Sequence, residues 1–401
     1  MNNYKLNIRE ESFGGTLLDL AVGKRIFVNS IELREIICDN RFPKDLKAFS
    51  GIMVPEIKFT PISKNEGEIK YFAFADIAFL EITRECNLRC RHCLNNSGEE
   101  MSKHMSTNDI KNLISKLAVA GIQEIRFTGG EPLIIKGIFE LIKYATDLGI
   151  YTSIGTNGTL ITENVALKLK QSGLKKVVIS LDGTEKSHDY IRGKGNYLKT
   201  CKAMEYIRQY GIELKINSVI MRDNMDDVIS LAKEMHIKKY NMFIRRFIES
   251  GRGINLVGNM LTKTDYEYVN KKLTYELSTG QYIRGHYIRL QDESNKPRIE
   301  LPFKLKTGCK AGQRAMVITP NGDIHFCGFL AAQGFKSIAN ISDIKDWRLF
   351  WNGINPQCTF KDLQKALDEY NFIDNIQQTN CLAYAQRLIN MKEETKKEDF
   401  L

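Results

Sequence analysis

The sequence of 401 residues contains little that would attach the protein to a membrane or export it. It has no run of about eighteen uncharged apolar residues, so no membrane-spanning helix is expected. The first residues, MNNYKLNIREE, lack a hydrophobic block behind a basic region, so no secretory signal is expected either. Only 8 residues are proline, and 43% are hydrophobic, as in an ordinary folded protein. We therefore expect a cytoplasmic protein with a well-packed core.

Acidic residues are in the minority, because 58 lysines and arginines face 48 aspartates and glutamates and leave a net charge of +10. This excess favours acidic partners such as an acidic peptide or a nucleotide. The lysines are spread over amphipathic segments and are typical of solvated helix surfaces. No arginine-rich stripe with interleaved aromatic residues occurs, so nucleic-acid binding is not expected.

The nine cysteines are unevenly distributed. A cytoplasmic chain keeps its thiols reduced, so cysteines at short spacings predict metal ligands rather than disulfides. Cys86, Cys90 and Cys93 lie in ECNLRCRHC, directly after the apolar run IAFLEI. Three thiolates on an iron–sulfur cube leave one iron open, and a zinc site is the alternative. Cys38 and Cys201 have no cysteine neighbour and are expected to be packing residues.

Three regions separate by pattern, with boundaries at 1–75, 76–255 and 256–401. In the middle region, strand-like runs alternate with amphipathic helical patterns, several of which are stopped by glycine. The predicted strands are IAFLEI, QEIRF, YTSIGT, KVVISL, LKINSVI and YNMFIRRF. Strands joined by crossover helices form a parallel sheet, which predicts an α/β fold of the partial (βα)6 TIM-type barrel kind. Its active site should lie at the carboxyl ends of the strands.

The cysteine spacing C-x3-C-x2-C is followed, at the ends of successive strands, by FTGGEP, GTNGTL and ISLDG. Together these motifs resemble those of the radical S-adenosylmethionine (SAM) enzymes. The resemblance implies a 4Fe-4S cluster whose open iron chelates the amino and carboxylate groups of SAM. One electron, from a flavodoxin- or ferredoxin-type donor, would cleave SAM to methionine and a deoxyadenosyl radical that abstracts hydrogen from the substrate.

The glycine pair of TGGEP removes two side chains after the second predicted strand. Gly129 and Gly130 would let the backbone approach a ligand. Glu131 would place a carboxylate near the methionine ammonium group. Asp182 and Gly183 in ISLDG are interpreted either as a loop turn or as functional residues.

Further cofactor contacts follow from the resemblance alone. Asn157 and Ser180, at the ends of the third and fourth strands, would be polar groups that line the cofactor. Arg192, in HDYIRG, would pair with the SAM carboxylate. His92 takes the position before the third cysteine that the family usually fills with an aromatic residue near the adenine.

The C-terminal region carries a second cysteine pattern. Cys309 and Cys327 flank AMVITPNGDIHF, in which NGD between two strand-like runs predicts a hairpin. The stretch resembles the opening of the SPASM and twitch auxiliary-cluster domains. A full SPASM domain adds a cysteine-dense tail, whereas this chain offers only Cys358 and Cys381. We therefore expect one auxiliary 4Fe-4S cluster held by these four cysteines; free thiols are the alternative for the last two.

The N-terminal segment, residues 1–75, bears on the substrate. YKLNI, GGTLLDL and KRIFVN predict three short strands, followed by a helix SIELREIIC capped by Asn29 or Ser30. This order resembles the start of the leader-peptide recognition domain of ribosomal-peptide (RiPP) maturases, which captures an extended peptide by strand addition. A structural cap over the barrel is the alternative.

The combined prediction is a radical SAM enzyme of the SPASM/twitch type that acts on a leader-bearing peptide. It would form a thioether or carbon–carbon cross-link, or epimerise a residue. Maturation of a small molecule or cofactor, as in haem- or aminoglycoside-related twitch enzymes, is the alternative within enzymes. RNA modification would need a basic, aromatic-rich extra domain, which is not seen. A noncatalytic iron–sulfur binding protein would not need the TGGEP loop.

Overall fold

The structure is a computed structural model. It describes residues 4–44, 46, 52–53, 56–62, 72–99, 104–277, 283–284, 287–289, 312, 314–332, 334 and 336–353. Three of the predicted auxiliary ligands, Cys309, Cys358 and Cys381, lie outside the described residues. Among the helices that are described, none is long and apolar enough to span a bilayer.

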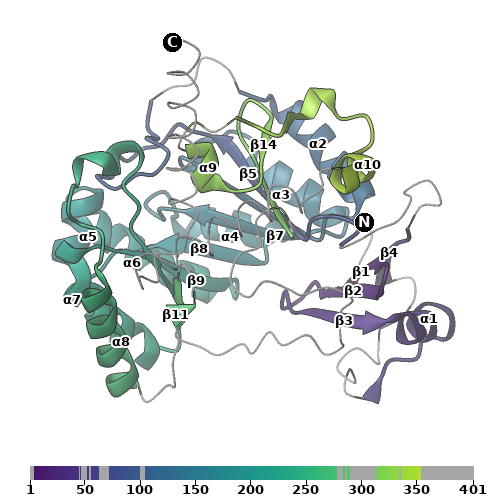
Figure 1. Cartoon of the computed structure of the whole chain (residues 1–401), viewed down its shortest axis with the longest axis horizontal. Helices are drawn as coiled ribbons and strands as arrows, with labels where there is room; N and C mark the ends of the chain where they lie inside the picture. Colours follow the sequence, from purple (N-terminus) through teal and green to yellow (C-terminus); the bar gives the residue numbers. More distant parts are fainter. Residues whose placement is uncertain are drawn as a thin grey trace, which may run out of the picture.

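A small four-stranded sheet is formed by the N-terminal segment (Figure 1). The three predicted strands are confirmed as β1 (Leu6–Glu11), β2 (Gly14–Asp19) and β3 (Arg25–Asn29). Helix α1 (Ser30–Asp39) begins after Asn29, whose side chain accepts a hydrogen bond from the Glu32 amide at 3.0 Å. A fourth strand, β4 (Ile57–Thr60), pairs parallel to β1. The strand order is β3-β2-β1-β4.

The larger sheet contains the six predicted parallel strands in sequential order. They are β5 (Ile77–Thr83), β6 (Glu124–Gly129), β7 (Tyr151–Thr156), β8 (Lys176–Ser180), β9 (Glu213–Ile220) and β10 (Asn241–Arg246). The crossover helices are α2 (Thr107–Ala120), α3 (Ile138–Asp147), α4 (Glu163–Gln171), α5 (Glu185–Arg192), α6 (Asn196–Gln209) and α7 (Met225–Ile237). Because the strand order is linear, this α/β barrel is partial and open.

Alternation along the strands separates a buried outer face from a more polar inner face. On β9, Leu214 and Ile216 are buried in the main core, whereas Lys215 and Asn217 are half-buried. The same core includes Phe127 of β6 and Ile154 of β7. This pattern is expected when helices cover one face of the sheet and the other face lines the barrel interior.

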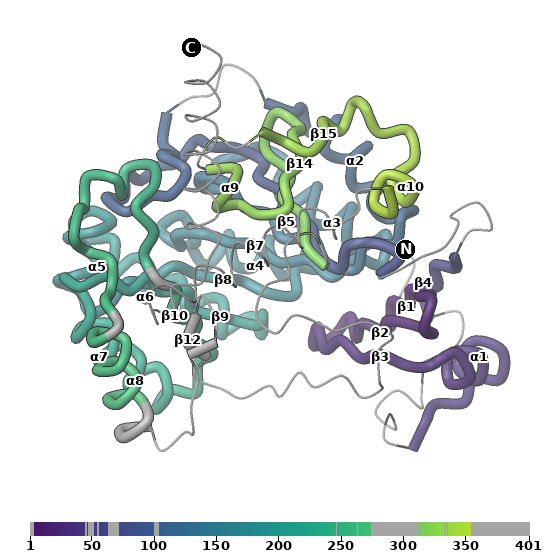
Figure 2. The backbone as a smooth tube through the Cα atoms, in the orientation of Figure 1, coloured from purple at the N-terminus to yellow at the C-terminus, as the bar shows by residue number. Residues whose placement is uncertain are grey.

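The C-terminal strands extend the same sheet beyond β5 (Figure 2). Strand β13 (Ala315–Ile318) pairs parallel to β5, and β14 (Asp323–His325) turns back against β13. The predicted hairpin around NGD is therefore confirmed, and the Thr319 amide closes its turn by donating to the Asp323 carbonyl at 2.9 Å. Helix α9 (Gly328–Ala332), β15 (Ala339–Asn340) and α10 (Trp347–Gly353) follow. At the opposite edge, β12 (Tyr287–Arg289) and β11 (Ile283–Arg284) continue the sheet beyond β10, and α8 (Lys263–Leu277) precedes them.

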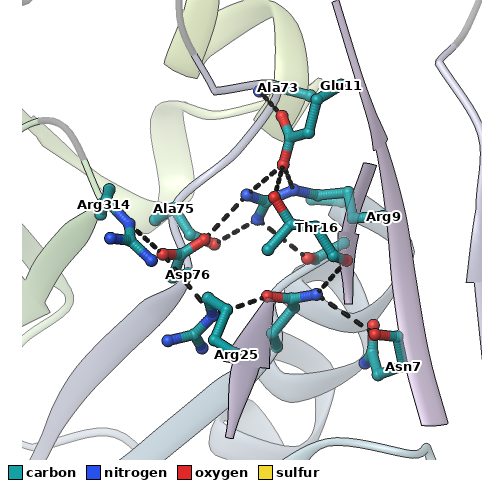
Figure 3. Close-up of polar contacts among 12 residues, drawn as sticks. Asn7, Arg9, Glu11, Thr16, Arg25, Ala73, Ala75, Asp76 and Arg314 are labelled. Carbon is teal, nitrogen blue, oxygen red and sulfur yellow. Dashed lines mark hydrogen bonds and ion pairs between the residues drawn. The ribbon is translucent and has the colours of Figure 1, made fainter. Parts of the chain in front are cut away.

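A buried cluster of charged side chains joins the two sheets (Figure 3). Asp76, directly before β5, accepts from Arg9 of β1 at 2.9 Å and from Arg314, directly before β13. Arg25 of β3 lies 3.6 Å from the same carboxylate. The Arg9 Nε also donates to Glu11 at 2.7 Å, and both side chains are fully buried. One carboxylate thus connects the N-terminal sheet, the first barrel strand and the C-terminal hairpin.

Neutral contacts in the same region show which end of the barrel the N-terminal sheet contacts. Gln123, directly before β6, donates to the Thr16 carbonyl at 2.9 Å. Asn7 donates to the carbonyl of Gly149, two residues before β7, at 2.8 Å. The N-terminal sheet therefore packs at the amino ends of the parallel strands, opposite the end at which the cysteine loop begins.

Candidate active site at the carboxyl ends of the strands

The loop after β5 carries the three clustered cysteines, as predicted. Cys90 is buried, and Cys86 and Cys93 are half-buried. Each sulfur accepts a hydrogen bond: Cys86 from the Leu88 amide at 3.4 Å, Cys93 from the Ser97 amide at 3.4 Å, and Cys90 from the Arg192 guanidinium at 3.8 Å. Such donors stabilise thiolates and tune iron–sulfur clusters.

Burial raises the pKa of the Cys86 and Cys90 thiols, because a thiolate loses hydration there. A bound metal group would supply the positive charge that offsets this cost. No group of three His, Cys, Asp or Glu side chains in the described part of the chain is placed to hold a single metal ion. A 4Fe-4S cube makes a different demand, because each thiolate binds a separate iron at its own corner. Three soft thiolate donors in one loop fit such a cube.

The TGGEP glycines allow two loops to approach each other closely. A Cβ on Gly129 would lie 2.0 Å from the Thr83 carbonyl oxygen, and one on Gly130 would lie 2.0 Å from that of Glu85. The Gly130 amide donates to the Thr83 carbonyl at 2.7 Å. The absence of side chains at Gly129 and Gly130 therefore allows these residues to pack against the start of the cysteine loop. Direct contact of these glycines with a ligand stays a prediction.

Glu131 is fully buried and holds the loop after β7. Its carboxylate accepts from the Asn157 amide at 2.8 Å, the Thr156 hydroxyl at 2.8 Å and the Leu133 amide at 3.1 Å. Burial raises the pKa of Glu131 to about 7, although these three donors favour the carboxylate. All of these hydrogen bonds are made within the protein, so an interaction with the methionine ammonium group stays a prediction.

Asn157 connects the β7 loop to the cysteine loop. Its side-chain amide donates to Asn87 at 2.9 Å and lies 3.8 Å from the Cys86 sulfur. Ser180, the last residue of β8, is half-buried and lies in register with Asn217 of β9. The structure therefore places both predicted residues at the carboxyl ends of their strands, the end from which the cysteine loop extends.

Arg192 and His92 meet at a residue whose role the sequence left open. The Arg192 Nε donates to Asp182 Oδ2 at 2.5 Å, and His92 Nε2 donates to the same oxygen at 2.7 Å. All three side chains are buried. Arg192 ends helix α5, which the sequence analysis did not assign. The carboxylate paired with Arg192 in this structure is therefore that of Asp182, and pairing of Arg192 with the SAM carboxylate stays a prediction.

Arg252 was missed by the sequence analysis. It lies in a short 3₁₀ turn, Gly251–Asn255, after β10. Its side chain donates to the Cys90 carbonyl at 2.8 Å, and its amide donates to the Cys93 carbonyl at 3.0 Å. A Cβ on Gly251 would lie 2.4 Å from the Cys93 carbonyl oxygen. The motif SGRG, with glycines on both sides of an arginine after the last barrel strand, was the available signal.

The other described cysteines lie outside this loop. Cys327 follows β14, is half-buried, and accepts from the Phe329 amide at 3.4 Å. Cys201, on α6, is half-buried. The expectation of a packing role for Cys38 was wrong, because it is exposed on α1, whose buried residues are Leu33 and Ile36.

Comparison with known proteins identifies the family to which this site belongs. Residues 80–235 match the description "Radical SAM superfamily". The AdoMet-dependent heme synthase of Oleidesulfovibrio alaskensis is 30% identical over 269 residues, covering 62% of this chain and 69% of that protein. The chain belongs to the radical SAM superfamily. Radical SAM enzymes use a 4Fe-4S cluster and SAM, and the bound pair supplies a carbon radical that abstracts hydrogen.

One further relative is a maturase by name, and one solved structure of similar fold contains a precursor peptide. The mycofactocin maturase MftC of Mycolicibacterium smegmatis is 30% identical over 270 residues, covering 66% of this chain and 67% of that protein. The crystal structure of Streptococcus suis SuiB bound to precursor peptide SuiA superposes with a TM-score of 0.64 at 19% identity. That superposition covers 89% of each chain and supports the predicted fold.

Proposed function

We propose that this radical SAM enzyme abstracts hydrogen from a leader-bearing peptide and thereby forms a thioether or carbon–carbon cross-link or epimerises a residue. The N-terminal sheet, with an outer strand suited to peptide addition, carries the proposal. In the proposed enzyme, residues 1–75 would recognise the peptide, residues 76–255 would form the radical SAM barrel, and residues 256–401 would contain a bridging region and a SPASM/twitch domain. Cys86, Cys90 and Cys93 would hold the SAM-binding cluster.

Strand β3 is the edge of the N-terminal sheet to which a peptide would add. The Asp19 amide donates to the Lys24 carbonyl at 3.0 Å, which marks a hydrogen-bonded pair of the β2–β3 ladder. Such pairs alternate in antiparallel sheets, so Ile26 and Val28 bond to β2 while the peptide groups of Arg25 and Phe27 face outward. In the described part of the chain no strand pairs with this edge. Strand addition requires such a row of outward donors and acceptors to be accessible along several residues. Ile26, Phe27 and Val28 are buried in the structure, so a peptide would have to displace the groups that cover this edge.

The position of the sheet constrains the substrate. It packs at the amino ends of the strands, whereas the cysteine loop follows their carboxyl ends. The seven residues of β5 span about 20 Å. An extended peptide therefore needs at least about six residues between the segment bound to β3 and the residue that is modified. The SuiB structure of similar fold contains a bound precursor peptide, and we extend a peptide substrate to this chain as a proposal.

A tetrapyrrole substrate is the second candidate. It is favoured by the heme synthase of O. alaskensis and by the Fe-coproporphyrin III synthase of Methanosarcina barkeri, which is 35% identical over 186 residues. A tetrapyrrole would leave the outward edge of β3 without a ligand. Anaerobic incubation with SAM, reductant and each substrate separates the two candidates. A cross-linked peptide would be lighter by one pair of hydrogen atoms, and an epimerised one would take up solvent deuterium.

We expect Ile31→Asp to weaken peptide binding about tenfold or more. Ile31 is 73% exposed in the first turn of α1, which follows the end of β3, and we expect a peptide added to β3 to contact it. The probe is a fluorescent synthetic peptide encoded by a short reading frame beside the gene, and the measurement is fluorescence anisotropy. Cleavage of SAM without peptide should stay at the wild-type rate.

Val119→Asp is the matched control, because Val119 is 80% exposed on α2 of the barrel. It should bind the peptide like the wild type. Equal affinities for the Ile31→Asp and wild-type proteins would contradict peptide capture at β3. So would a gene neighbourhood without a short reading frame.

A second cluster would be held by Cys309 and Cys327, with Cys358 and Cys381 as completing ligands. Four cysteines close one cube and leave no open iron, so this cluster would conduct electrons. After anaerobic reconstitution we expect about eight irons per chain, falling to about four in the Cys86/Cys90/Cys93 triple alanine variant. About twelve irons in the wild type, or none left in the variant, would refute the count.

A further inference from the structure

Asp182, in the loop directly after β8, is fully buried and accepts hydrogen bonds on both carboxylate oxygens. Oδ2 accepts from Arg192 at 2.5 Å and from His92 at 2.7 Å. Oδ1 accepts from the Val219 amide of β9 at 2.8 Å. A single carboxylate therefore joins the cysteine loop, the end of α5 and the neighbouring barrel strand.

Of the two side chains that donate to Oδ2, one belongs to the cysteine loop and the other contacts it. His92 lies between Cys90 and Cys93 in the sequence, and an Arg192 amino group lies 3.8 Å from the Cys90 sulfur. The guanidinium is thus held by Asp182 through Nε while Nη1 faces the sulfur. Because two nitrogens of the planar guanidinium each have a partner, the orientation of Arg192 is fixed. A flexible lysine ammonium group could not reproduce this arrangement.

The charges in this cluster support an ionised carboxylate. Burial disfavours the charged form, but Arg192 and His92 outweigh it and hold the pKa of Asp182 well below its usual range. His188 lies on the other side, where its Nδ1 accepts from the Asp182 amide at 3.2 Å. Burial lowers the pKa of His188 to about 4, so this imidazole adds no charge near neutral pH. Asp182 is therefore the counterion of the buried Arg192.

We propose that Asp182 is a positioning residue that holds Arg192 of α5 beside His92 of the cysteine loop in the orientation that receives SAM. The inference rests on the proposed assignment of Arg192 and His92 to the cofactor and does not depend on the peptide. Asp182 itself acts through these two side chains. The carboxylate is required because an amide has only one accepting atom, so it cannot serve the Val219 amide and the Arg192–His92 pair together.

Asp182→Asn should therefore raise the dissociation constant for SAM about 10- to 100-fold, the range typical of lost outer-shell partners. Binding is measured anaerobically on the reconstituted enzyme without peptide, by equilibrium dialysis. Iron and sulfide contents should equal those of the wild type, because Asp182 bonds to no cysteine side chain. Wild-type affinity for SAM in this variant would overturn the proposal.

Asp227→Asn is the matched control. Asp227, on α7, accepts from Thr184 at 2.8 Å and from Ser187, and so supports the opposite end of α5 without contacting Arg192 or His92. It should bind SAM like the wild type. An equal loss of affinity in both variants would show that general support of α5, rather than orientation of Arg192, determines binding, and would overturn the proposal.

A double-mutant cycle tests whether Asp182 acts through its partner. If it does, the double variant Asp182→Asn/Arg192→Gln should bind SAM less than about threefold more weakly than Arg192→Gln alone. Such non-additive losses are expected of residues in direct contact. Independent, multiplying losses would refute the positioning role. Should Asp182→Asn fail to fold, Arg192→Lys keeps Asp182 and the charge but loses the fork. Wild-type affinity in Arg192→Lys would then overturn the proposal.

Discussion

Replacing Cys86, Cys90 or Cys93 with alanine should reduce the formation of deoxyadenosine from SAM to background. Each sulfur has its own hydrogen-bond donor, Leu88 for Cys86, Ser97 for Cys93 and Arg192 of α5 for Cys90, so the three positions are not interchangeable. Two remaining thiolates cannot hold a cube that presents a single open iron. The measurement is deoxyadenosine released by the anaerobically reconstituted enzyme with a chemical reductant and no peptide.

Cys38→Ala and Cys201→Ala provide the controls. Cys38 is exposed on α1 and Cys201 is half-buried on α6, and neither lies in the cysteine loop. Both variants should release deoxyadenosine at the wild-type rate. If the Cys86/Cys90/Cys93 triple alanine variant still produced deoxyadenosine, the assignment of the cluster to this loop would be wrong.

The barrel could be predicted because its signals are local. Ser106 caps the amino end of α2, where its hydroxyl accepts from the Asp109 amide at 3.1 Å, and this cap is visible in the sequence as two polar residues three apart. Helix α5 was missed because EKSHDYIR is short and strongly polar, and of its buried residues Ser187, His188, Ile191 and Arg192 only Ile191 is apolar. An apolar stripe that narrow does not distinguish a helix from a loop.

The contacts inside the candidate site could be predicted only in part. The cysteine spacing is local and placed the loop after β5. The role of Asp182 is not local, because His92 is 90 residues away and the Val219 amide is 37 residues away. No periodicity connects such positions. Arg252 was missed for the same reason, since its contacts to Cys90 and Cys93 form only when the turn after β10 lies beside the loop after β5.

The charged residues of β1 were also beyond sequence reasoning. In LNIREE, Arg9 and Glu11 alternate with Ile8 and Glu10, a pattern typical of a strand with one solvated face. Here the face that carries Arg9 packs against the barrel and is buried. The ionic partner, Asp76, comes from a different region of the chain, so its pairing with Arg9 depends on how the two sheets dock.

Asp76→Ala should lower the free energy of unfolding by about 3–5 kcal/mol, the cost of leaving a buried charge uncompensated. Asp76 is fully buried and accepts from Arg9 and Arg314, and Arg25 lies 3.6 Å away (Figure 3). Without it, the guanidinium groups of Arg9, Arg25 and Arg314 lose the carboxylate that they share, and Arg9 keeps Glu11 as a partner. The change is measured by urea unfolding followed by circular dichroism.

Lys5→Gln is the control for this prediction, because Lys5 forms an exposed ion pair with Glu56 at 2.6 Å beside the same N-terminal sheet. The Lys5 side chain is 53% exposed, so its loss should change the free energy of unfolding by less than about 1 kcal/mol. An Asp76→Ala variant as stable as Lys5→Gln would show that the buried cluster does not hold the two sheets together. The large loss of stability in Asp76→Ala is expected because Asp76 is buried, so water cannot take its place as a partner of the arginine side chains.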